Sequence, residues 1–344
     1  MTCSVKIFSR TDRLLTELNN FHIGTRSWVL NGAGDCDLVV PRTDPKATEE
    51  NFGQKNLVVI ESDTGIPAWG GQVQEVDWSA PEWLKIRLRS KEILLRKHLG
   101  ILAGTLRPGD VVQQLLSRLI VANELPGITP GAIYRGGGMY PYDIRAWDMY
   151  DKILPELIKS TEKDEPQEHE WFVDGHGVFH WTSGRGEDRS ALVVLRSGYH
   201  LSKWPGYKLQ YDKILTRALG LGNAVSWADT TKSYWTEPTA AARWGILEEA
   251  IDVPSNTVMR TEKYARRLVR RNWSPREMMD ITINNRDGVW TQFWMGDIVR
   301  IVIPDFGWAE RGGCDTKIRV VGIEVEEEVR KMRIIGTVFT PNVE

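Results

Sequence analysis

The last quarter of the chain, residues 281–339, constrains the fold most, because its polarity alternates over successive stretches. In the stretch 298–303, IVRIVI, neighbouring side chains point to opposite faces of an extended backbone. A period of two in segments rich in β-branched residues predicts antiparallel strands. Turn residues at 296–297 and 304–307, and a polar apex at 326–331, separate these strands. Such a meander closes most easily into a small barrel or sandwich, which removes exposed strand edges.

The composition is that of a folded globular protein. Of the 344 residues 41% are hydrophobic, and 44 Lys and Arg stand against 46 Asp and Glu, so no bulk basic field attracts nucleic acid. Cys3, Cys36 and Cys314 are odd in number and widely spaced, which matches neither a disulfide framework nor a zinc ribbon. We therefore expect reduced thiols in a protein made inside a cell. We expect neither a secretion signal nor a membrane span.

The spacing of apolar residues along the chain changes three times, which predicts four segments. Residues 1–95 alternate strongly and are expected to form an N-terminal β domain. Residues 96–165 carry apolar residues at spacings of three and four, which predicts a helical insertion. Residues 166–224 are expected to be a β-rich insertion, and residues 225–344 a helix followed by a second β domain. The predicted fold class is mainly β with α insertions (α+β).

Three helix predictions follow from the spacing of apolar residues. A helix is predicted over residues 111–120, and a second one near 147–158 that is interrupted or kinked at Pro155. Thr261 is predicted to cap a third helix, Glu262–Asn272. The outer face of this third helix is basic, which indicates either a solvated face or a docking face for an acidic neighbour. Its basic residues are Arg266, Arg267, Arg270 and Arg271.

A cluster of histidines is the strongest metal-like pattern in the chain. It consists of His169, Asp174, His176 and His180. The step Asp174-Gly175 predicts a hairpin turn, which puts His176 at the apex and His180 on a strand. Histidines four apart bind zinc well on one face of a helix, so this geometry does not favour a metal site. We predict no metal and no cofactor.

The sequence lacks the motifs of the common enzyme classes. A phosphate-binding loop and a nucleophile elbow are both missing, and the glycine pair at 220–222 has no third glycine. Paired carboxylates near aromatic residues leave glycoside hydrolysis as an alternative. The candidate acids are Glu168, Glu170, Asp174 and Glu187. No catalytic residue is assigned, and the chain is predicted not to be an enzyme.

Both ends of the chain carry an ordered series of short motifs. The first part contains RSWVLNGAGDCDLVVP, then WGGQVQEVDW, then LKIRLRSKEILLRKHL. The last part contains ARWGILEEAI, EKYARRLVRRN, ITINNRD, MGDIVRIVIPDFG and KIRVVGIEVE, in that order. The series resembles the siphophage tail-tip and baseplate hub family, which includes late-control proteins and the spike hubs of type VI secretion systems. The resemblance covers about two-thirds of the chain and is weaker between residues 96 and 225.

The resemblance implies a structural, non-enzymatic virion protein at the tail tip, made in the host cytoplasm. Hubs of this family are homotrimers in which each chain supplies two tube-like β-barrels, here expected at 1–95 and 225–344. The ring would contact the distal tail protein, the tape-measure protein and fibre or spike proteins. Its lumen would pass tape measure and DNA, without specific binding of the DNA.

Two sets of residues are predicted to act in such a ring. Fifteen tryptophans are many for this length and suit either β cores or permanent contacts with neighbours. The candidate barrel or interface anchors are Trp69, Trp290, Trp294, Phe306 and Trp308. Acidic residues near 326 form either a solvated hairpin tip or a wall that repels DNA phosphates. The candidate lumen residues are Glu324, Glu326 and Glu328.

Three other functions stay open at this point. A distal tail protein would form a hexameric ring in place of a trimeric hub. A cell-wall carbohydrate-active hydrolase would need the carboxylates around 168–187, and a carbohydrate-binding module would stay monomeric with exposed aromatic residues. The oligomeric state, and whether replacing Glu170 abolishes hydrolysis of cell-wall glycan, therefore distinguish the alternatives.

Overall fold

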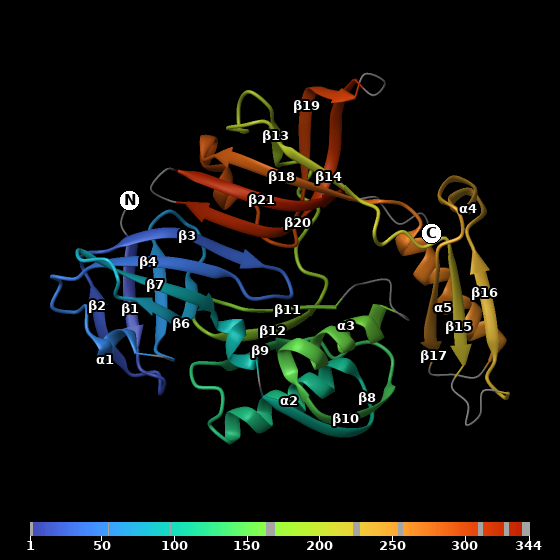
Figure 1. The fold of residues 1–344 in the computed structure, drawn as a ribbon, viewed down its shortest axis with the longest axis horizontal. Coiled ribbons are helices and arrows are strands. Elements are labelled where there is room, and N and C mark those ends of the chain that lie inside the picture. Colours follow the sequence, from blue (N-terminus) through green and yellow to red (C-terminus); the bar gives the residue numbers. More distant parts are fainter. Residues whose placement is uncertain are drawn as a thin grey trace. The chain divides into compact units, whose positions relative to one another are not determined.

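The computed structural model describes residues 3–53, 55–96, 98–162, 169–222, 228–253, 257–308, 312–326 and 330–338. The chain divides into two compact units, which we describe separately (Figure 1). Unit 1 comprises Met1–Gly206 and Asp280–Glu344, and unit 2 comprises Tyr207–Met279. The predicted mainly β character with added helices is confirmed. The division into four segments stays a prediction.

The first part of unit 1 is an antiparallel sheet. Its strands are β1 (Cys3–Phe8), β2 (Leu14–Leu18), β3 (His22–Val29), β4 (Asp35–Pro41), β5 (Leu57–Ser62), β6 (Trp69–Asp77) and β7 (Trp83–Ser90), with α1 (Glu49–Phe52) in between. They pair in the order β3-β4-β7-β6-β5-β1-β2. On β7, Leu84, Ile86 and Leu88 are buried and their neighbours Lys85 and Arg87 are exposed. This alternation gives the sheet one apolar face, which forms a core of its own.

The middle of unit 1 mixes helices and strands. Its elements are η1 (Lys91–Leu95), β8 (Leu99–Leu106), α2 (Pro108–Val121), β9 (Thr129–Ile133), β10 (Tyr140–Asp148), η2 (Met149–Ile153), α3 (Leu154–Glu162), β11 (His169–Val173) and β12 (Val178–Ser183). The apolar face of α2 packs with Trp171, Phe179 and Trp181 in a second core. The helix predicted over 111–120 is confirmed. Pro155 lies in the first turn of α3, directly after the π-helical turn η2, so the change of helix type falls beside the proline, which cannot donate a helical hydrogen bond.

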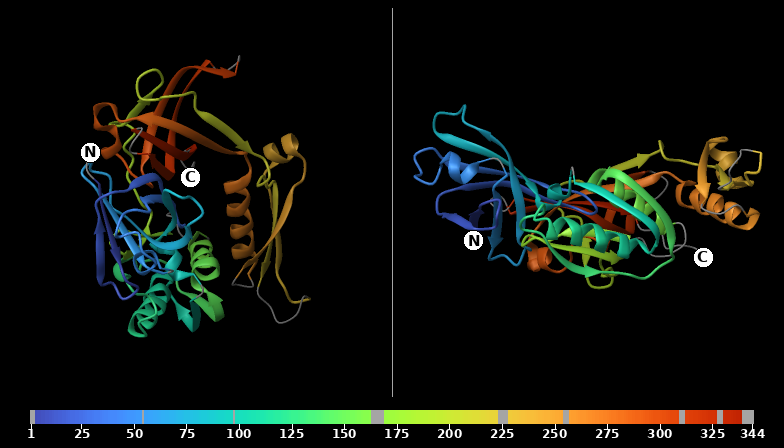
Figure 2. Two further views of the ribbon diagram at one scale, coloured as in Figure 1. Left: turned by 60° about the vertical axis from the view of Figure 1, so that its left-hand side comes forward. Right: turned by 90° about the horizontal axis from the view of Figure 1, so that it is seen from below.

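The last part of unit 1 joins the first through a shared sheet. Its elements are β13 (Val194–Arg196), β18 (Arg276–Asn284), η3 (Arg286–Thr291), β19 (Ile298–Trp308), β20 (Gly312–Glu326) and β21 (Lys331–Val338). The predicted alternation is confirmed, since Val299, Ile301 and Ile303 are buried and Arg300 is exposed. β20 pairs with β3, so thirteen described strands belong to one sheet (Figure 2). The pairings among the described residues do not close this sheet into a barrel.

Unit 2 is a small two-layer structure. Its sheet has the order β16-β15-β17, from β15 (Arg217–Gly222), β16 (Lys232–Thr236) and β17 (Glu248–Val253), and it also holds α4 (Pro238–Trp244) and α5 (Val258–Asn272). β14 (Gly206–Gln210) leads the chain into unit 2. Helix α5 covers the sheet so closely that a Cβ on Gly220 would lie 2.3 Å from the carbonyl oxygen of Thr261.

The predicted start of the third helix is wrong by four residues. α5 begins at Val258 with Thr257 in the N-cap position, and Thr261 lies inside the helix. Its hydroxyl is buried and shares a 2.7 Å hydrogen bond with the hydroxyl of Ser233 on β16. Thr261 therefore fastens the helix to the sheet and does not cap it, and only the tertiary contact with β16 reveals this role.

The turn between β11 and β12 uses its glycines differently from the prediction. The turn itself exists, because the Asp174 N–H donates to the carbonyl oxygen of Val178 at 3.0 Å. The residue with positive φ is Gly177, at +96°. Gly175 serves a close approach, since a Cβ there would lie 2.2 Å from the carbonyl oxygen of Ala68. The hairpin thus packs backbone to backbone against the start of β6.

Candidate functional site

Two glycine turns meet where the middle and the last part of unit 1 come together. Gly186 and Gly296 both have positive φ, at +90° and +91°. A Cβ on Gly186 would lie 2.2 Å from the carbonyl carbon of Gly296, so neither turn has room for a side chain here. Backbone bonds hold the turns together, because the Ile298 N–H donates to the Glu187 carbonyl and the Arg189 N–H donates to the Ile298 carbonyl, each at 2.9 Å.

Five charged side chains surround these turns, and we call them the ionic junction. They are Glu170, Arg185, Arg189, Asp297 and Arg319. The side chain of Glu170 on β11 is only 1% exposed, and Arg319 on β20 donates to its carboxylate through Nη2. The backbone N–H of Arg185 donates to the other carboxylate oxygen at 2.6 Å. Arg319 also donates to the carbonyl oxygen of Arg185 at 3.2 Å.

Asp297 ties the turn at Gly296 to the segment that follows Gly186. Its Oδ1 accepts a hydrogen bond from the Glu187 N–H at 2.8 Å, and its Oδ2 accepts one from the Trp294 N–H at 2.7 Å. Arg189 Nε lies 3.2 Å from the same Oδ2. A buried carboxylate is tolerated where donors and a cation surround it in this way.

Burial shifts the pKa values of two groups at the junction. The guanidinium of Arg185 stacks 3.6 Å from the ring centroid of Phe172. Burial lowers the pKa of Arg185 to about 10, against the opposing charges of Glu170, Glu92 and Asp297, so the side chain is still a cation at neutral pH. Burial also raises the pKa of Glu92 on η1 to about 7.

Glu92 therefore makes the stability of the protein depend on pH. Because its folded pKa is about 7 against an ordinary 4.5, its favourable contribution is complete below pH 4.5 and is lost as pH rises towards 7. Glu92→Gln keeps the acceptor for the Val173 N–H. Between pH 4.5 and 8 we expect the wild type to lose up to about 3 kcal/mol of unfolding free energy relative to this variant.

Urea titrations at several pH values measure this difference. The matched control is Glu75→Gln, at an exposed acid on β6 that pairs with Arg87. Its stability is expected to run parallel to the wild type across the same range. Equal pH profiles for the wild type and Glu92→Gln would contradict the assignment.

The ionic junction bears directly on the carboxylates considered for hydrolysis. Glu170 is buried against Arg319, Asp174 accepts the N–H groups of His176 and Val178 in its turn, and exposed Glu187 lies 3.3 Å from Arg189. Glu168 lies outside the described residues. Glu170 and Asp174 thus hold turns and segments together, whereas Glu187 pairs only with a residue two positions along the chain. No group of three potential metal ligands occurs among the described residues, the histidine cluster included.

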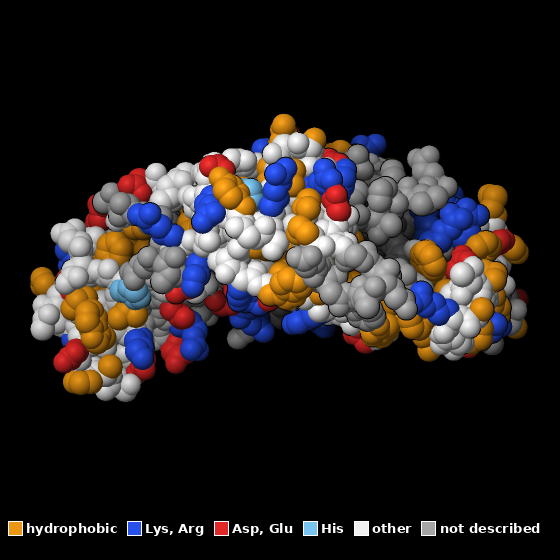
Figure 3. Space-filling model, turned by 90° about the horizontal axis from the view of Figure 1, so that it is seen from above, with side chains coloured by type: hydrophobic (Ala, Val, Ile, Leu, Met, Phe, Trp, Pro, Cys, Tyr) orange, Lys and Arg blue, Asp and Glu red, His pale blue; other side chains and the backbone are white. Residues whose placement is uncertain are grey.

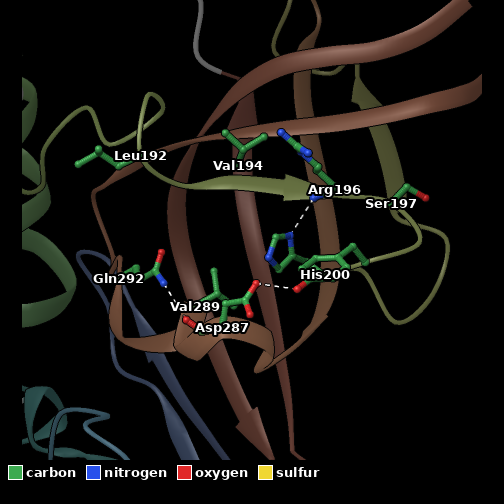
Figure 4. Close-up of a pocket in the computed structure, with 9 residues that line it drawn as sticks. Leu192, Val194, Arg196, Ser197, His200, Asp287, Val289 and Gln292 are labelled. Atoms are coloured by element: carbon green, nitrogen blue, oxygen red, sulfur yellow. Dashed lines mark hydrogen bonds between the residues drawn. The ribbon is translucent and has the colours of Figure 1, made fainter.

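A second feature of unit 1 is a pocket of about 540 Å³ between β13 and η3 (Figure 4). His200 Nδ1 accepts the Arg196 N–H at 3.2 Å, and burial lowers the pKa of its imidazole. The Tyr199 hydroxyl donates to Asp287 at 2.8 Å. Asp287 is the only acid among the described residues that line the pocket. The pocket therefore lacks the acid pair that glycoside hydrolysis requires.

The structure places three of the predicted anchor tryptophans inside unit 1. Trp69 is fully buried and its Nε1 donates to the carbonyl oxygen of Ser27 at 3.0 Å. Trp290 on η3 is also buried. Trp294 meets Trp28 of β3 edge to face, with ring centroids 5.2 Å apart, and so connects the first and last parts of the unit.

The other predicted residues lie on β19 and β20 or beyond them. Phe306 and Trp308 belong to β19, but their side chains fall outside the described residues, as does all of Glu328. Glu324 on β20 accepts a hydrogen bond from Arg333 Nη1 at 2.8 Å, and Arg333 also binds Asp280. Glu326 is exposed at the end of β20. Their assignment to a lumen stays a prediction.

Sequence reasoning missed most of the ionic junction. The sequence assigns no role to Arg185 and Arg319 or to His200 and Asp287 of the pocket, and it predicts Asp297 only as a turn residue. The only local signal was glycine at 186 and 296, which indicates turns but does not reveal that the two turns touch. The partners are far apart in the chain, so no motif or period connects them.

Three solved structures share the fold along almost the whole chain. Prophage tail protein gp18 from Listeria monocytogenes EGD-e has a TM-score of 0.63 at 12% identity, covering 99% of this chain and 96% of its own. The tail protein from Neisseria meningitidis MC58 has a TM-score of 0.67 at 14% identity, covering 98% and 97%. The 43 kDa tail protein of prophage MuSo2 from Shewanella oneidensis has a TM-score of 0.65 at 14% identity, covering 99% of both chains.

These identities are too low to show more than a common fold. No protein-family model and no curated protein matches the sequence. Among the described residues, no helix combines the length and the apolar character that crossing a membrane requires.

Proposed function

We propose that this chain, which has the fold of prophage tail proteins, is a structural component of a phage tail and part of the virion. The observation that carries the proposal is the extent of the likeness, which spans 98–99% of the chain with TM-scores of 0.63–0.67. All three of those structures are of tail proteins. The engagement of Glu170, Asp174 and Glu187 in structural contacts supports a role in assembly over a role in hydrolysis.

Within the tail we propose the position of the hub at the distal end of a siphophage-type tube. Three copies would form a ring in which the segments 1–95 and 225–344 supply tube-like β domains. The pairing of β3 with β20 supports this, because it places strands of both segments in one sheet. Tight anchoring of that sheet by Trp28 and Trp294 suits a ring that must carry load.

The proposed ring binds the distal tail protein on one side and fibre or spike proteins on the other. Tape-measure protein and DNA pass through its lumen without specific binding. Glu326 and its neighbours would line the lumen, where negative charge repels DNA phosphates and keeps the duplex from adhering. Glu324 is less suited to this task, because Arg333 neutralises it.

The mass of the assembled chain tests the proposal. Light scattering on the purified protein is expected to give three times the 39.2 kDa chain mass, with a threefold ring in negative-stain images. A sixfold ring would contradict the hub assignment and identify the chain as a distal tail protein. A monomer that hydrolyses cell-wall glycan, and loses this activity in Glu170→Gln, would overturn the structural role altogether.

A further inference from the structure

The pocket between β13 and η3 has no part in the proposed assembly of the tail. One of its walls is an extended segment of which alternate residues face the pocket, namely Leu192, Val194 and Arg196. The residues between them, Val193 and Leu195, are buried on the other side of the segment. The core of unit 1 therefore supports this wall and fixes the direction of the side chains that line it.

The opposite wall offers hydrogen-bond acceptors to the pocket. Oδ2 of Asp287 accepts the Tyr199 hydroxyl at 2.8 Å, which leaves Oδ1 without a partner among the described residues. Gln292 donates through Nε2 to the carbonyl oxygen of Asp287 at 3.0 Å, so its Oε1 is available to a ligand. In Figure 4, Gln292 and His200 lie on either side of the hollow between Val194 and Asp287.

Hydrogen-bond donors and two cations complete the pocket. Nδ1 of His200 accepts the Arg196 N–H at 3.2 Å, so the ring hydrogen is on Nε2, which can donate to a ligand. Arg286 stacks over Tyr199, with Cζ 5.1 Å from the ring centroid. Within the described part of the chain, the side chains of Arg196 and Arg286 form no hydrogen bond or ion pair.

The charges around His200 lie close to one another. Burial lowers the pKa of His200, the charge of Asp287 opposes this shift, and the charges of Arg196 and Arg286 add to it. Both cations are thus near the ring whose Nε2 lines the hollow. Seen from above in Figure 3, the side of unit 1 that carries β13 presents basic, acidic, histidine and hydrophobic side chains next to one another.

Asp287 is held in a strained backbone conformation. Its φ is +55° and that of the next residue, Gly288, is +65°. The left-handed region is unfavourable for a residue with a side chain, and such strain is common at binding sites. The hydrogen bonds to Tyr199 and Gln292 hold Asp287 in place, so its carboxylate is fixed before a ligand arrives.

We infer that this pocket binds an acidic saccharide, a ligand that carries hydroxyl groups and a carboxylate on the same ring. The carboxylate suits the two arginines, because guanidinium groups bind carboxylates through paired hydrogen bonds. A simple anion would meet the free acceptors of Asp287 and Gln292 without offering them a donor, and sugar hydroxyls supply such donors. An apolar ligand would leave the same groups unpaired. The volume of about 540 Å³ is typical of small-ligand sites.

Calorimetric titration of the full chain with three probes tests the class of ligand. The probes are trigalacturonate, maltotriose and citrate. Maltotriose has as many sugar units as trigalacturonate but no charge, and citrate has as many carboxylates but no sugar ring. We expect trigalacturonate to bind, and each of the other two to bind at least about tenfold more weakly, because each lacks one of the two kinds of group.

Two variants test the place of binding. Arg196→Gln/Arg286→Gln removes both cations from exposed positions and is expected to weaken trigalacturonate binding by on the order of 100-fold. Val194→Phe fills the hollow without a change of charge and is expected to abolish binding. The matched control, Arg10→Gln/Arg13→Gln, removes two exposed arginines from the turn between β1 and β2 and is expected to bind like the wild type. Melting temperatures show that each variant is folded.

Each of the other outcomes overturns the inference. Equal binding of citrate would show a general anion site, and equal binding of maltotriose would show that the acid group plays no part. Binding that persists in both pocket variants, or is lost equally in the control, would place the ligand elsewhere. No heat of binding with millimolar trigalacturonate would remove the site altogether.

This site is independent of the proposed hub, and the two fail separately. A trimeric ring that does not bind trigalacturonate overturns the saccharide pocket and leaves the hub intact. A chain that binds trigalacturonate in the pocket but stays monomeric supports the pocket and contradicts the trimer.

Discussion

Replacing Arg319 by Met is expected to lower the free energy of unfolding by about 3–5 kcal/mol, because it leaves a buried carboxylate without its cation. Glu170 is 1% exposed, and after the change its carboxylate keeps the N–H of Arg185 but loses the guanidinium donor of Arg319. Methionine fills much of the space of the arginine stem, so lost packing contributes little. Urea unfolding of the purified variant measures the effect.

Lys317→Met is the matched control for this change. Lys317 lies two residues earlier on the same strand and pairs with Asp188 at 3.0 Å, but both side chains are nearly half exposed. Water screens such a pair, and its loss is expected to cost less than about 1 kcal/mol. If both variants lose the same stability, the ionic junction does not hold the middle and last parts of unit 1 together.

Replacing Gly186 by Ala is expected to cost about 2–5 kcal/mol, since strain and a steric clash act at the same residue. The φ of +90° is unfavourable for any side chain, and the new Cβ would lie 2.2 Å from the carbonyl carbon of Gly296. That neighbour is backbone in a tight turn, so it cannot rotate away. The two turns must move apart. The backbone hydrogen bonds that join Ile298 to Glu187 and Arg189 are then weakened.

The same segment offers a control that isolates the clash. Gly184 has a φ of +76°, but nothing lies within 4 Å of a Cβ built there. Gly184→Ala therefore carries only the conformational strain, about 1–2 kcal/mol. Thermal unfolding of the two variants side by side measures the difference. Equal melting temperatures would show that the two turns do not touch in solution.

The local pattern of the chain predicted strands such as β7 and β19 and the helix α2, but it missed β8 and β10 in the segment expected to be helical. Burial of alternate residues on β7 and β19 and the helical spacing of α2 all depend on neighbours within a few positions. Such patterns are visible in one sequence because a segment must turn its apolar side to the core wherever that core lies. Thr261 shows the limit, since its hydroxyl binds Ser233 at a place that local preference assigns to a cap.

The mainly β class, the position of most elements and the absence of common enzyme motifs could therefore be inferred from the sequence alone. The roles of the charged residues and glycines became clear only from the folded chain. Glu170 and Arg319 are 149 positions apart, and nothing near either residue indicates the other. Gly296 was predicted as a turn residue, but its contact with Gly186 depends on how separate segments pack. A buried charge or a missing Cβ acquires its role from atoms that folding brings together from distant parts of the chain. Contacts of this kind produce no periodic pattern in the sequence.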